Sequence, residues 1–157
     1  MKRSTCVYLI RDGKWLMLLR DRKKDDVNHG KWIGVGGKCL SGESFEACAI
    51  RETKEETGLT IMAPKFRGFL EFRYETLEPE QIAVYTAEEF SGEEAACDEG
   101  TLAWIEEEKI LDLELWEGDR LFLKRLLSND ASNFEFLLEY DDQGNLINAE
   151  ERKGDRT

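Results

Sequence analysis

Residues 37–59 read GKCLSGESFEACAIRETKEETGL, and this stretch carries the strongest local signals in the chain. Ser44 is a favourable N-cap, because its hydroxyl can accept a hydrogen bond from a free backbone N–H group of the first turn. Gly58 is a favourable residue after the last turn, and Leu59 follows as the apolar contact of a Schellman-type ending. The sequence therefore predicts a helix over residues 45–57.

Three glutamates share one face of that helix. At about 100° per residue, Glu52, Glu55 and Glu56 fall within one arc of about 100°. Like charges at this spacing destabilise an isolated helix by roughly 0.2–0.5 kcal/mol per pair. The nearby bases, Arg51 and Lys54, project to the flank and the back of this face, whereas a solvated acidic face would have lysines interleaved. We interpret the cluster as oxygen ligands for a hard divalent cation such as Mg²⁺ or Mn²⁺.

Glycines stand ahead of the same helix. Gly34, Gly36 and Gly37 allow the backbone to approach a ligand closely and to adopt positive φ. A glycine-containing loop in front of a helix that carries glutamates has the outline of a site for a metal ion and a phosphate group.

The spacing of these residues resembles the Nudix box, the signature of hydrolases that act on a nucleoside diphosphate linked to another moiety. Gly37 is followed after five residues by Glu43 and, after seven more, by the run RETKEETGL at residues 51–59. Every charged and glycine position of the motif is present, and Thr53 is the one departure, at a usually aliphatic position. The resemblance implies the Nudix fold, an α+β architecture with a mixed sheet sandwiched between helices.

The resemblance also implies roles for particular residues. Glu52 is the favoured general base, and Arg51 is expected to orient the glutamates, notably Glu43, rather than to contact substrate. The expected metal ligands are the main-chain carbonyl of Gly36 or Gly37 and the carboxylates of Glu52, Glu55 and Glu56.

A further acidic pair lies upstream of a predicted strand. Asp98 and Glu99 precede Gly100, and an acidic pair entering a strand is normally a turn. In the family, a glutamate at a comparable point often completes the metal site, and Glu99 matches that point better than Asp98. Glu99 is also the alternative candidate for the general base.

The densest group of bases in the chain lies in the polar loop before the glycines and comprises Arg20, Arg22, Lys23 and Lys24. This loop is either simply solvated or brings bases, Lys23 among them, to a triphosphate. Lys38 is open in a similar way, either to contact with substrate or to orienting the glutamates.

Composition and charge restrict the class of protein. The chain has 157 residues, 41% of them hydrophobic, which is enough for one domain with a substantial core. We expect a single domain over residues 1–157, with a frayed, charged tail from about residue 150. The net charge of −12 argues against stable binding of nucleic acid, and with it against an RNA-decapping role. No apolar run has transmembrane length and no signal peptide is recognisable, so we expect a cytoplasmic protein without membrane contact, either a monomer or a homodimer.

Apolar periodicity and turn signals predict the remaining elements. Asp12-Gly13 is a hairpin signal between the first two strands. A short turn or helix is expected over residues 106–115, and an amphipathic helix over residues 117–127. Strands are expected at residues 5–10, 15–20, 60–63, 66–74, 81–86, 101–105, 134–140 and 146–149.

A second resemblance concerns the choice of substrate. The segments KWIGVGGK, DEG and LELWEGDRLFLKRLL and the predicted carboxy-terminal hairpin are similar to the branch of the family that removes oxidised purine nucleotides, the 8-oxo-dGTP diphosphatases. Trp116 and Asp119 fall where that branch contacts the purine, although Trp116 is alternatively a core aromatic. Gly118 and Ile33 depart from the pattern, since an aspartate and an amide are found there. If this segment is core packing, Phe72 and Tyr74 are the next candidates for substrate contact.

The resemblances together imply a metal-dependent pyrophosphohydrolase that converts a nucleoside triphosphate, such as 8-oxo-dGTP, to the monophosphate and pyrophosphate. The alternatives are a Nudix hydrolase for a nucleotide sugar, a dinucleoside polyphosphate or an ordinary nucleoside triphosphate. A non-catalytic Nudix module that only binds a ligand is a remote alternative, because no glutamate of the motif is missing.

Overall fold

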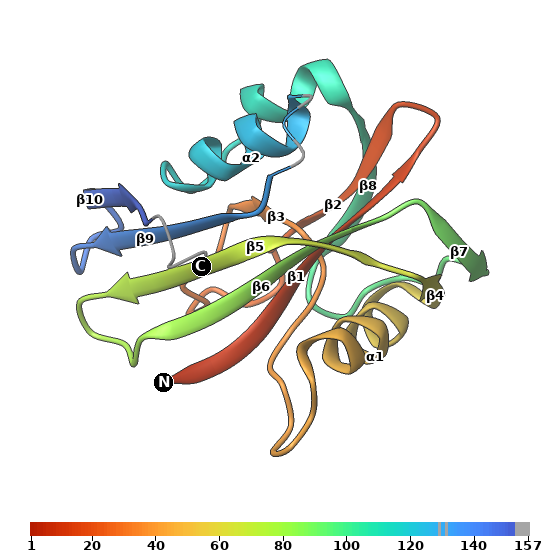
Figure 1. The fold of residues 1–157 in the computed structure, drawn as a ribbon, viewed down its shortest axis with the longest axis horizontal. Helices are drawn as coiled ribbons and strands as arrows, with labels where there is room; N and C mark the ends of the chain where they lie inside the picture. Colours follow the sequence, from red (N-terminus) through yellow and green to blue (C-terminus); the bar gives the residue numbers. More distant parts are fainter. Residues whose placement is uncertain (129, 131, 153–157) are drawn as a thin grey trace.

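The computed structural model describes residues 1–128, 130 and 132–152. Within that part of the chain, an eight-stranded sheet and a two-stranded sheet are accompanied by two α-helices and a 3₁₀ helix (Figure 1). The helices are α1 (Phe45–Thr57), η1 (Glu107–Asp112) and α2 (Asp119–Leu127). The strands are β1 (Lys2–Arg11), β2 (Lys14–Leu19), β3 (Trp32–Ile33), β4 (Leu59–Met62), β5 (Lys65–Tyr74), β6 (Glu80–Ala87), β7 (Glu89–Gly92), β8 (Thr101–Glu106), β9 (Phe134–Tyr140) and β10 (Leu146–Glu151).

The larger sheet is mixed, as predicted. Its strand order is β10-β9-β5-β6-β1-β2-β3, and β8 also pairs with β2. β1 runs parallel to β6 and β5 runs parallel to β9, whereas the remaining pairs are antiparallel. The hairpin between β1 and β2 turns at Asp12 and Gly13, whose positive φ angles of 54° and 72° suit a tight two-residue connection.

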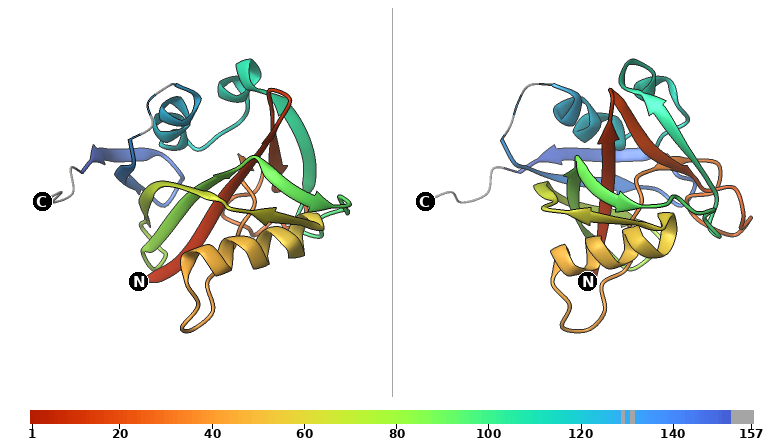
Figure 2. Two further views of the ribbon diagram at one scale, coloured as in Figure 1. Left: turned by 45° about the vertical axis from the view of Figure 1, so that its right-hand side comes forward. Right: turned by 90° about the vertical axis from the view of Figure 1, so that its right-hand side faces the viewer.

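The sheet is covered by α1 on one face and by α2 on the other, which both views of Figure 2 show. Successive residues of β1 point to opposite faces, so the strand contributes to two separate cores. Tyr8 packs in the cluster that contains Phe122 of α2. Val7 and Leu9 pack in the cluster that contains Ala49 of α1. The predicted arrangement of a sheet between helices is confirmed.

Helix α1 has the predicted bounds and caps. The Ser44 hydroxyl accepts a hydrogen bond of 3.1 Å from the Ala47 N–H group. At the other end Gly58 adopts a left-handed conformation, with φ of 82°, and its N–H group donates to the Lys54 carbonyl at 2.9 Å. A Cβ atom at Gly58 would lie 2.4 Å from the Glu93 carbonyl oxygen, so glycine is also required for space.

Several element boundaries differ from the predictions. β10 extends to Glu151 and pairs with β9, so the expectation of a frayed tail from residue 150 is wrong for its first two residues. Residues 153–157 of that tail lie outside the described residues. The short strands β3 and β7 were not predicted, because a run of two to four residues is too brief to show a period.

Candidate active site

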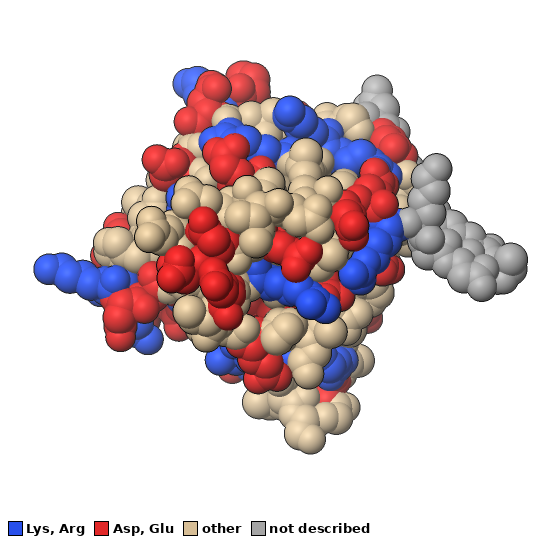
Figure 3. Space-filling view, turned by 90° about the vertical axis from the view of Figure 1, so that its left-hand side faces the viewer, with Lys and Arg blue, Asp and Glu red and all other residues tan. Residues whose placement is uncertain are grey.

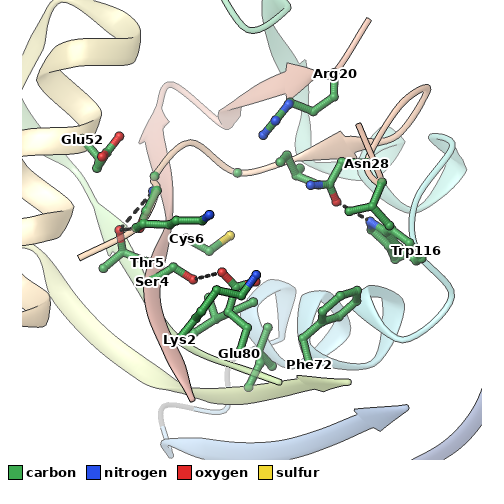
Figure 4. A pocket seen from close by; sticks show the side chains of 18 of the residues that line it. Lys2, Ser4, Thr5, Cys6, Arg20, Asn28, Glu52, Phe72, Glu80 and Trp116 are labelled. Carbon is green, nitrogen blue, oxygen red and sulfur yellow. Dashed lines mark hydrogen bonds between the residues drawn. The ribbon is translucent and has the colours of Figure 1, made fainter. Parts of the chain in front are cut away.

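A pocket of about 550 Å³ extends from the amino-terminal loop of α1 to the start of α2. Figure 4 shows Glu52 at one end of this pocket and Trp116 at the other, with side chains of β1 and β6 between them. Among the residues predicted to form the site, those that line the pocket are Lys23, Gly37, Lys38, Glu52, Glu56, Phe72, Glu99, Trp116 and Asp119. The pocket therefore joins the predicted metal site to the predicted nucleobase site.

Glu52, Glu56 and Glu99 line one end of the pocket, which we call the carboxylate end. Glu56 is the buried residue of the three. Its Oε1 atom accepts a hydrogen bond of 2.7 Å from the Gly36 N–H group, and its residue is 9% exposed. Burial raises the pKa of Glu56 to about 7, although the hydrogen bond from Gly36 opposes the shift. The negative charges of Glu99 and Glu52 raise it further, so both of these carboxylates lie close enough to Glu56 to repel its charged form.

The glycines bring backbone and carboxylates together. A Cβ atom at Gly37 would lie 2.5 Å from the Glu52 carboxyl group, and one at Gly36 would lie 2.1 Å from the Thr5 carbonyl oxygen. The Gly37 carbonyl accepts a hydrogen bond from the Thr5 N–H group at 2.9 Å. A side chain at Gly36 would push the loop away from the backbone of β1, and one at Gly37 would displace the Glu52 carboxyl group.

Arg51 connects the preceding loop to the acidic face of α1. Its guanidinium group binds Glu43 through two hydrogen bonds, of 2.8 Å from Nε and 2.9 Å from Nη2. It also donates to Glu52 at 2.9 Å and to Glu55 at 3.2 Å. The bonds from Arg51 hold the pKa of Glu43 at about 2, so Glu43 is a permanent anion in this ion-pair network.

Glu52, Glu55 and Glu56 of α1 do not all turn toward the pocket. Glu55 has a side chain that is 57% exposed, faces Arg51 and lies outside the pocket lining. Within the described residues, no three His, Cys, Asp or Glu side chains converge closely enough to hold a metal ion as they stand. Ligation by Glu55 together with Glu52 and Glu56 would therefore require side-chain rotation. The donor set itself, carboxylate and carbonyl oxygens with mutually repelling charges, fits Mg²⁺ or Mn²⁺.

The basic loop reaches the pocket mainly through Arg20, whose specific contacts the sequence did not reveal. Its Nη2 atom lies 3.0 Å from the Glu99 carboxylate, and its Nε atom lies 2.9 Å from Asp26. Lys23 and Lys38 also line the pocket, whereas Arg22 and Lys24 do not. Glu99 is thus held at the carboxylate end by an arginine from a distant part of the chain.

Aromatic side chains form the other end of the pocket. Trp116 is 4% exposed and packs edge-on against Phe72, with ring centroids 5.4 Å apart, and against Tyr140 at 4.8 Å. It belongs both to the core and to the pocket wall, so the two interpretations of this residue are compatible. Tyr74 lies outside the pocket lining, and its hydroxyl donates to the Asp142 carbonyl.

Asp119 is the acidic group of this aromatic end. Burial raises its pKa from 3.8 to about 7, and the charge of Lys31 opposes that shift only in part. Among the described residues its carboxyl group has no hydrogen-bond partner of its own, and it lines the pocket. The group is therefore available to a ligand as either a donor or an acceptor near neutral pH.

Polar residues of β1 and β6 complete the wall and were missed from the sequence. Ser4 and Cys6 alternate with core residues on β1, and the Ser4 hydroxyl donates to Glu80 at 2.7 Å. Side chains alternate between the two faces of a strand, so Ser4 and Cys6 fall on the same face of β1. This alternation is the sequence signal that could have identified them.

Charges of both signs are mixed on the molecular face that Figure 3 shows. On the face in Figure 3, Lys and Arg side chains are interleaved with Asp and Glu rather than gathered into a basic stripe. Among the described residues, no helix is both long and apolar enough to cross a membrane.

Comparisons with known proteins identify relatives of this chain. The family model described as the NUDIX domain matches residues 1–126. The chain is 34% identical over 128 residues to the oxidized purine nucleoside triphosphate hydrolase of Danio rerio, which covers 80% of each protein. It is 31% identical over 124 residues to the uncharacterized Nudix hydrolase YvcI of Bacillus subtilis strain 168, over 76% of this chain and 75% of that protein.

Its fold also matches the crystal structure of a mutator MutT protein from Bacillus halodurans. The TM-score is 0.85 at 24% identity, over 96% of this chain and 97% of the other. On the match of the family model and the relatives, the chain belongs to the Nudix hydrolase family.

Proposed function

We propose that the protein is a metal-dependent pyrophosphohydrolase that cleaves a nucleoside triphosphate to the monophosphate and pyrophosphate, with an oxidised purine nucleotide such as 8-oxo-dGTP as its preferred substrate. The observation that carries this proposal is a pocket of about 550 Å³ with carboxylates at one end and, at the other, a buried Trp and a partly exposed Asp. A volume of this size accommodates a nucleotide. The name of the Danio rerio relative supports the same class of substrate.

The metal ion would be held by oxygen atoms of the carboxylate end. Its ligands would come from the Gly37 carbonyl and from Glu52, Glu55, Glu56 and Glu99. When bound, a divalent cation supplies neutralisation of phosphate charge and Lewis-acid polarisation of the phosphoryl group. Burial is the main cause of the raised pKa of Glu56, and the negative charges of Glu99 and Glu52 add to it; a cation would relieve this repulsion.

The chain itself supplies the base, its orientation and the phosphate contacts. Glu52 lies against Gly37 at the pocket wall and is assigned as general base for the attacking water, with Glu99 as the alternative. Arg51 positions Glu52 by a hydrogen bond of 2.9 Å. Lys23 and Lys38 line the same pocket and are assigned to the phosphate groups.

The nucleobase is assigned to the aromatic end. Trp116 and Phe72 offer apolar surface to any base, whereas Asp119 can discriminate by hydrogen bonding. Since burial raises the pKa of Asp119 to about 7, its carboxyl group can present a proton to a base acceptor at neutral pH.

An ordinary purine triphosphate is the second candidate substrate, and two observations favour it. Ile33 lines the pocket without a polar atom at the position where the oxidised-purine branch carries an amide. A Cβ atom at Gly118 would lie 2.6 Å from the Tyr140 hydroxyl oxygen, so this chain leaves no room for the second aspartate of that branch.

A substrate panel tests the proposal. Purified protein with Mg²⁺ or Mn²⁺ is incubated with 8-oxo-dGTP, dGTP, dATP, a pyrimidine triphosphate, a nucleotide sugar and a dinucleoside polyphosphate, and the products are identified by mass. We expect monophosphate and pyrophosphate from the purine triphosphates, with the highest kcat/KM for 8-oxo-dGTP. Turnover of only the sugar or dinucleoside compounds would overturn the proposed substrate class.

A further inference from the structure

Asn28 lies in the loop between β2 and β3 and lines the aromatic end of the pocket. Its Oδ1 atom accepts a hydrogen bond of 2.8 Å from the Trp116 indole N–H group. The two residues are 88 positions apart in the sequence, so the bond joins the loop to the segment that precedes α2. Figure 4 shows this contact at the end of the pocket that we assign to the nucleobase.

The bond to Trp116 fixes which way the amide group faces. An indole N–H group can only donate, so the amide oxygen of Asn28 has to face it. The amide nitrogen must then lie on the other side, and in Figure 4 it points away from Trp116 toward the pocket interior. Among the described residues, Nδ2 has no hydrogen-bond partner, which leaves two N–H donors available to a ligand.

The loop holds Asn28 in place before any ligand arrives. The Asn28 N–H group donates to Asp26 Oδ1 at 3.1 Å, and Asp26 Oδ2 lies 2.9 Å from Nε of Arg20. The Asn28 carbonyl accepts from the Lys31 N–H group at 2.9 Å. A donor that is already ordered loses little conformational entropy on binding, so a hydrogen bond from it contributes more to affinity.

We propose that Asn28 selects the nucleobase by donating a hydrogen bond from Nδ2 to a carbonyl oxygen of an oxopurine, an inference that rests on the proposed function. The side chain of Ile33, in the strand β3 that follows this loop, is apolar, and the loop supplies an amide from another position, Asn28. Guanine carries a carbonyl at position 6 and 8-oxopurines carry one at position 8, whereas adenine carries neither. A base that lacks the acceptor covers this donor and leaves it unpaired, which is unfavourable.

Asn28→Asp separates this role from the anchoring of Trp116. The variant keeps an oxygen that accepts from the indole N–H group, and it replaces the donor with a second oxygen that repels a carbonyl. Binding of 8-oxo-dGMP, dGMP, 8-oxo-dAMP and dAMP is measured by calorimetry without metal, so the test does not depend on hydrolysis. Asn133→Asp, an exposed position outside the pocket lining, adds the same charge as a control.

We expect the preference for the oxopurines over dAMP to fall by about tenfold or more in Asn28→Asp and to be unchanged in Asn133→Asp. If Asn28→Asp loses affinity for 8-oxo-dAMP, the acceptor is the carbonyl at position 8. If it loses affinity for dGMP, the acceptor is the carbonyl at position 6. Equal losses for all four ligands would overturn the inference, because Asn28 would then act only through charge or through Trp116. Wild-type protein that binds 8-oxo-dGMP selectively but hydrolyses no triphosphate would refute the proposed function alone, and a wild type that binds none of the four would refute both.

Discussion

Thr53 and Thr57 lie one turn apart on the buried face of α1, and their hydroxyl groups differ in how well they are paired. Both residues are 0% exposed. The Thr57 hydroxyl donates to the Thr53 carbonyl at 2.7 Å and accepts from the Leu59 N–H group at 3.0 Å. The Thr53 hydroxyl, at the position where the family motif is usually aliphatic, has no hydrogen-bond partner within residues 1–128, 130 and 132–152. This departure from the motif is therefore unfavourable for stability.

We predict that Thr53→Val raises the free energy of unfolding by about 1 kcal/mol, because it removes a buried unpaired hydroxyl and keeps the branched shape. Thr57→Val is the matched control and should lower the free energy of unfolding by about 1 kcal/mol or more, since Leu59 loses its partner. Urea denaturation of the three proteins measures both changes. A destabilised Thr53→Val variant would contradict the account of this position.

The raised pKa of Asp119 leads us to predict that the stability of the folded protein depends on pH. Its pKa is about 7 in the folded protein, against an ordinary value of 3.8, so the folded state binds the proton more tightly. The stabilisation that this proton gives to the folded state is fully present below the pKa of Asp119 in the unfolded chain. It is lost as pH rises through about 7. Between pH 5 and pH 8, wild type should lose about 2 kcal/mol of unfolding free energy relative to Asp119→Asn, which cannot titrate. Denaturant titrations at both pH values measure the difference, and a gain with rising pH would refute the prediction.

At the scale of elements, α1 and the loop before it act as one unit through Arg51. Arg51→Lys keeps the charge but loses the planar fork that binds Glu43 through two atoms while it reaches Glu52. We predict a fall in kcat/KM of roughly 10–100-fold, as is usual when a group that orients metal ligands is replaced.

The fold should survive that substitution, which circular dichroism and thermal unfolding would check. Arg73→Lys, in an ion pair with Glu71 on β5 outside the pocket lining, is the control and should leave kcat/KM unchanged. Unchanged kinetics in Arg51→Lys as well would show that Arg51 is only a surface partner of Glu43.

The elements differ in how well the sequence predicts them. α1 was predicted to the residue because its caps, Ser44 and Gly58, are local signals. The contact between Arg51 and Glu43 followed from the family motif. Two contacts join distant segments: the ion pair of Arg20 with Glu99 and the hydrogen bond of Asn28 with Trp116. They could not be predicted, because the periodicity of a single segment does not show which other segment it contacts.

At the scale of the whole molecule, the sheet separates two cores and the pocket draws residues from both sides. Glu52 and Glu56 come from α1, which packs on one face. Asp119 is the first residue of α2, which packs on the other face, and Trp116 lies just before that helix. The carboxylate end could be predicted from the motif because it is contained in one helix and its loop. The aromatic end could be predicted only in part, since it depends on how α2 and the loop before β3 meet across the sheet.

The most direct test of the account is the kcat of Glu52→Gln at saturating Mg²⁺ with the best nucleotide of the panel. The substitution keeps the shape of the side chain that lies against Gly37 and removes its charge and basicity. Glu46→Gln, exposed in the first turn of the same helix, is the control and should retain wild-type turnover. We predict a loss of at least about 10³ in kcat for Glu52→Gln, near 4 kcal/mol of activation barrier. Turnover above about a tenth of wild type would contradict the assignment of Glu52 as general base.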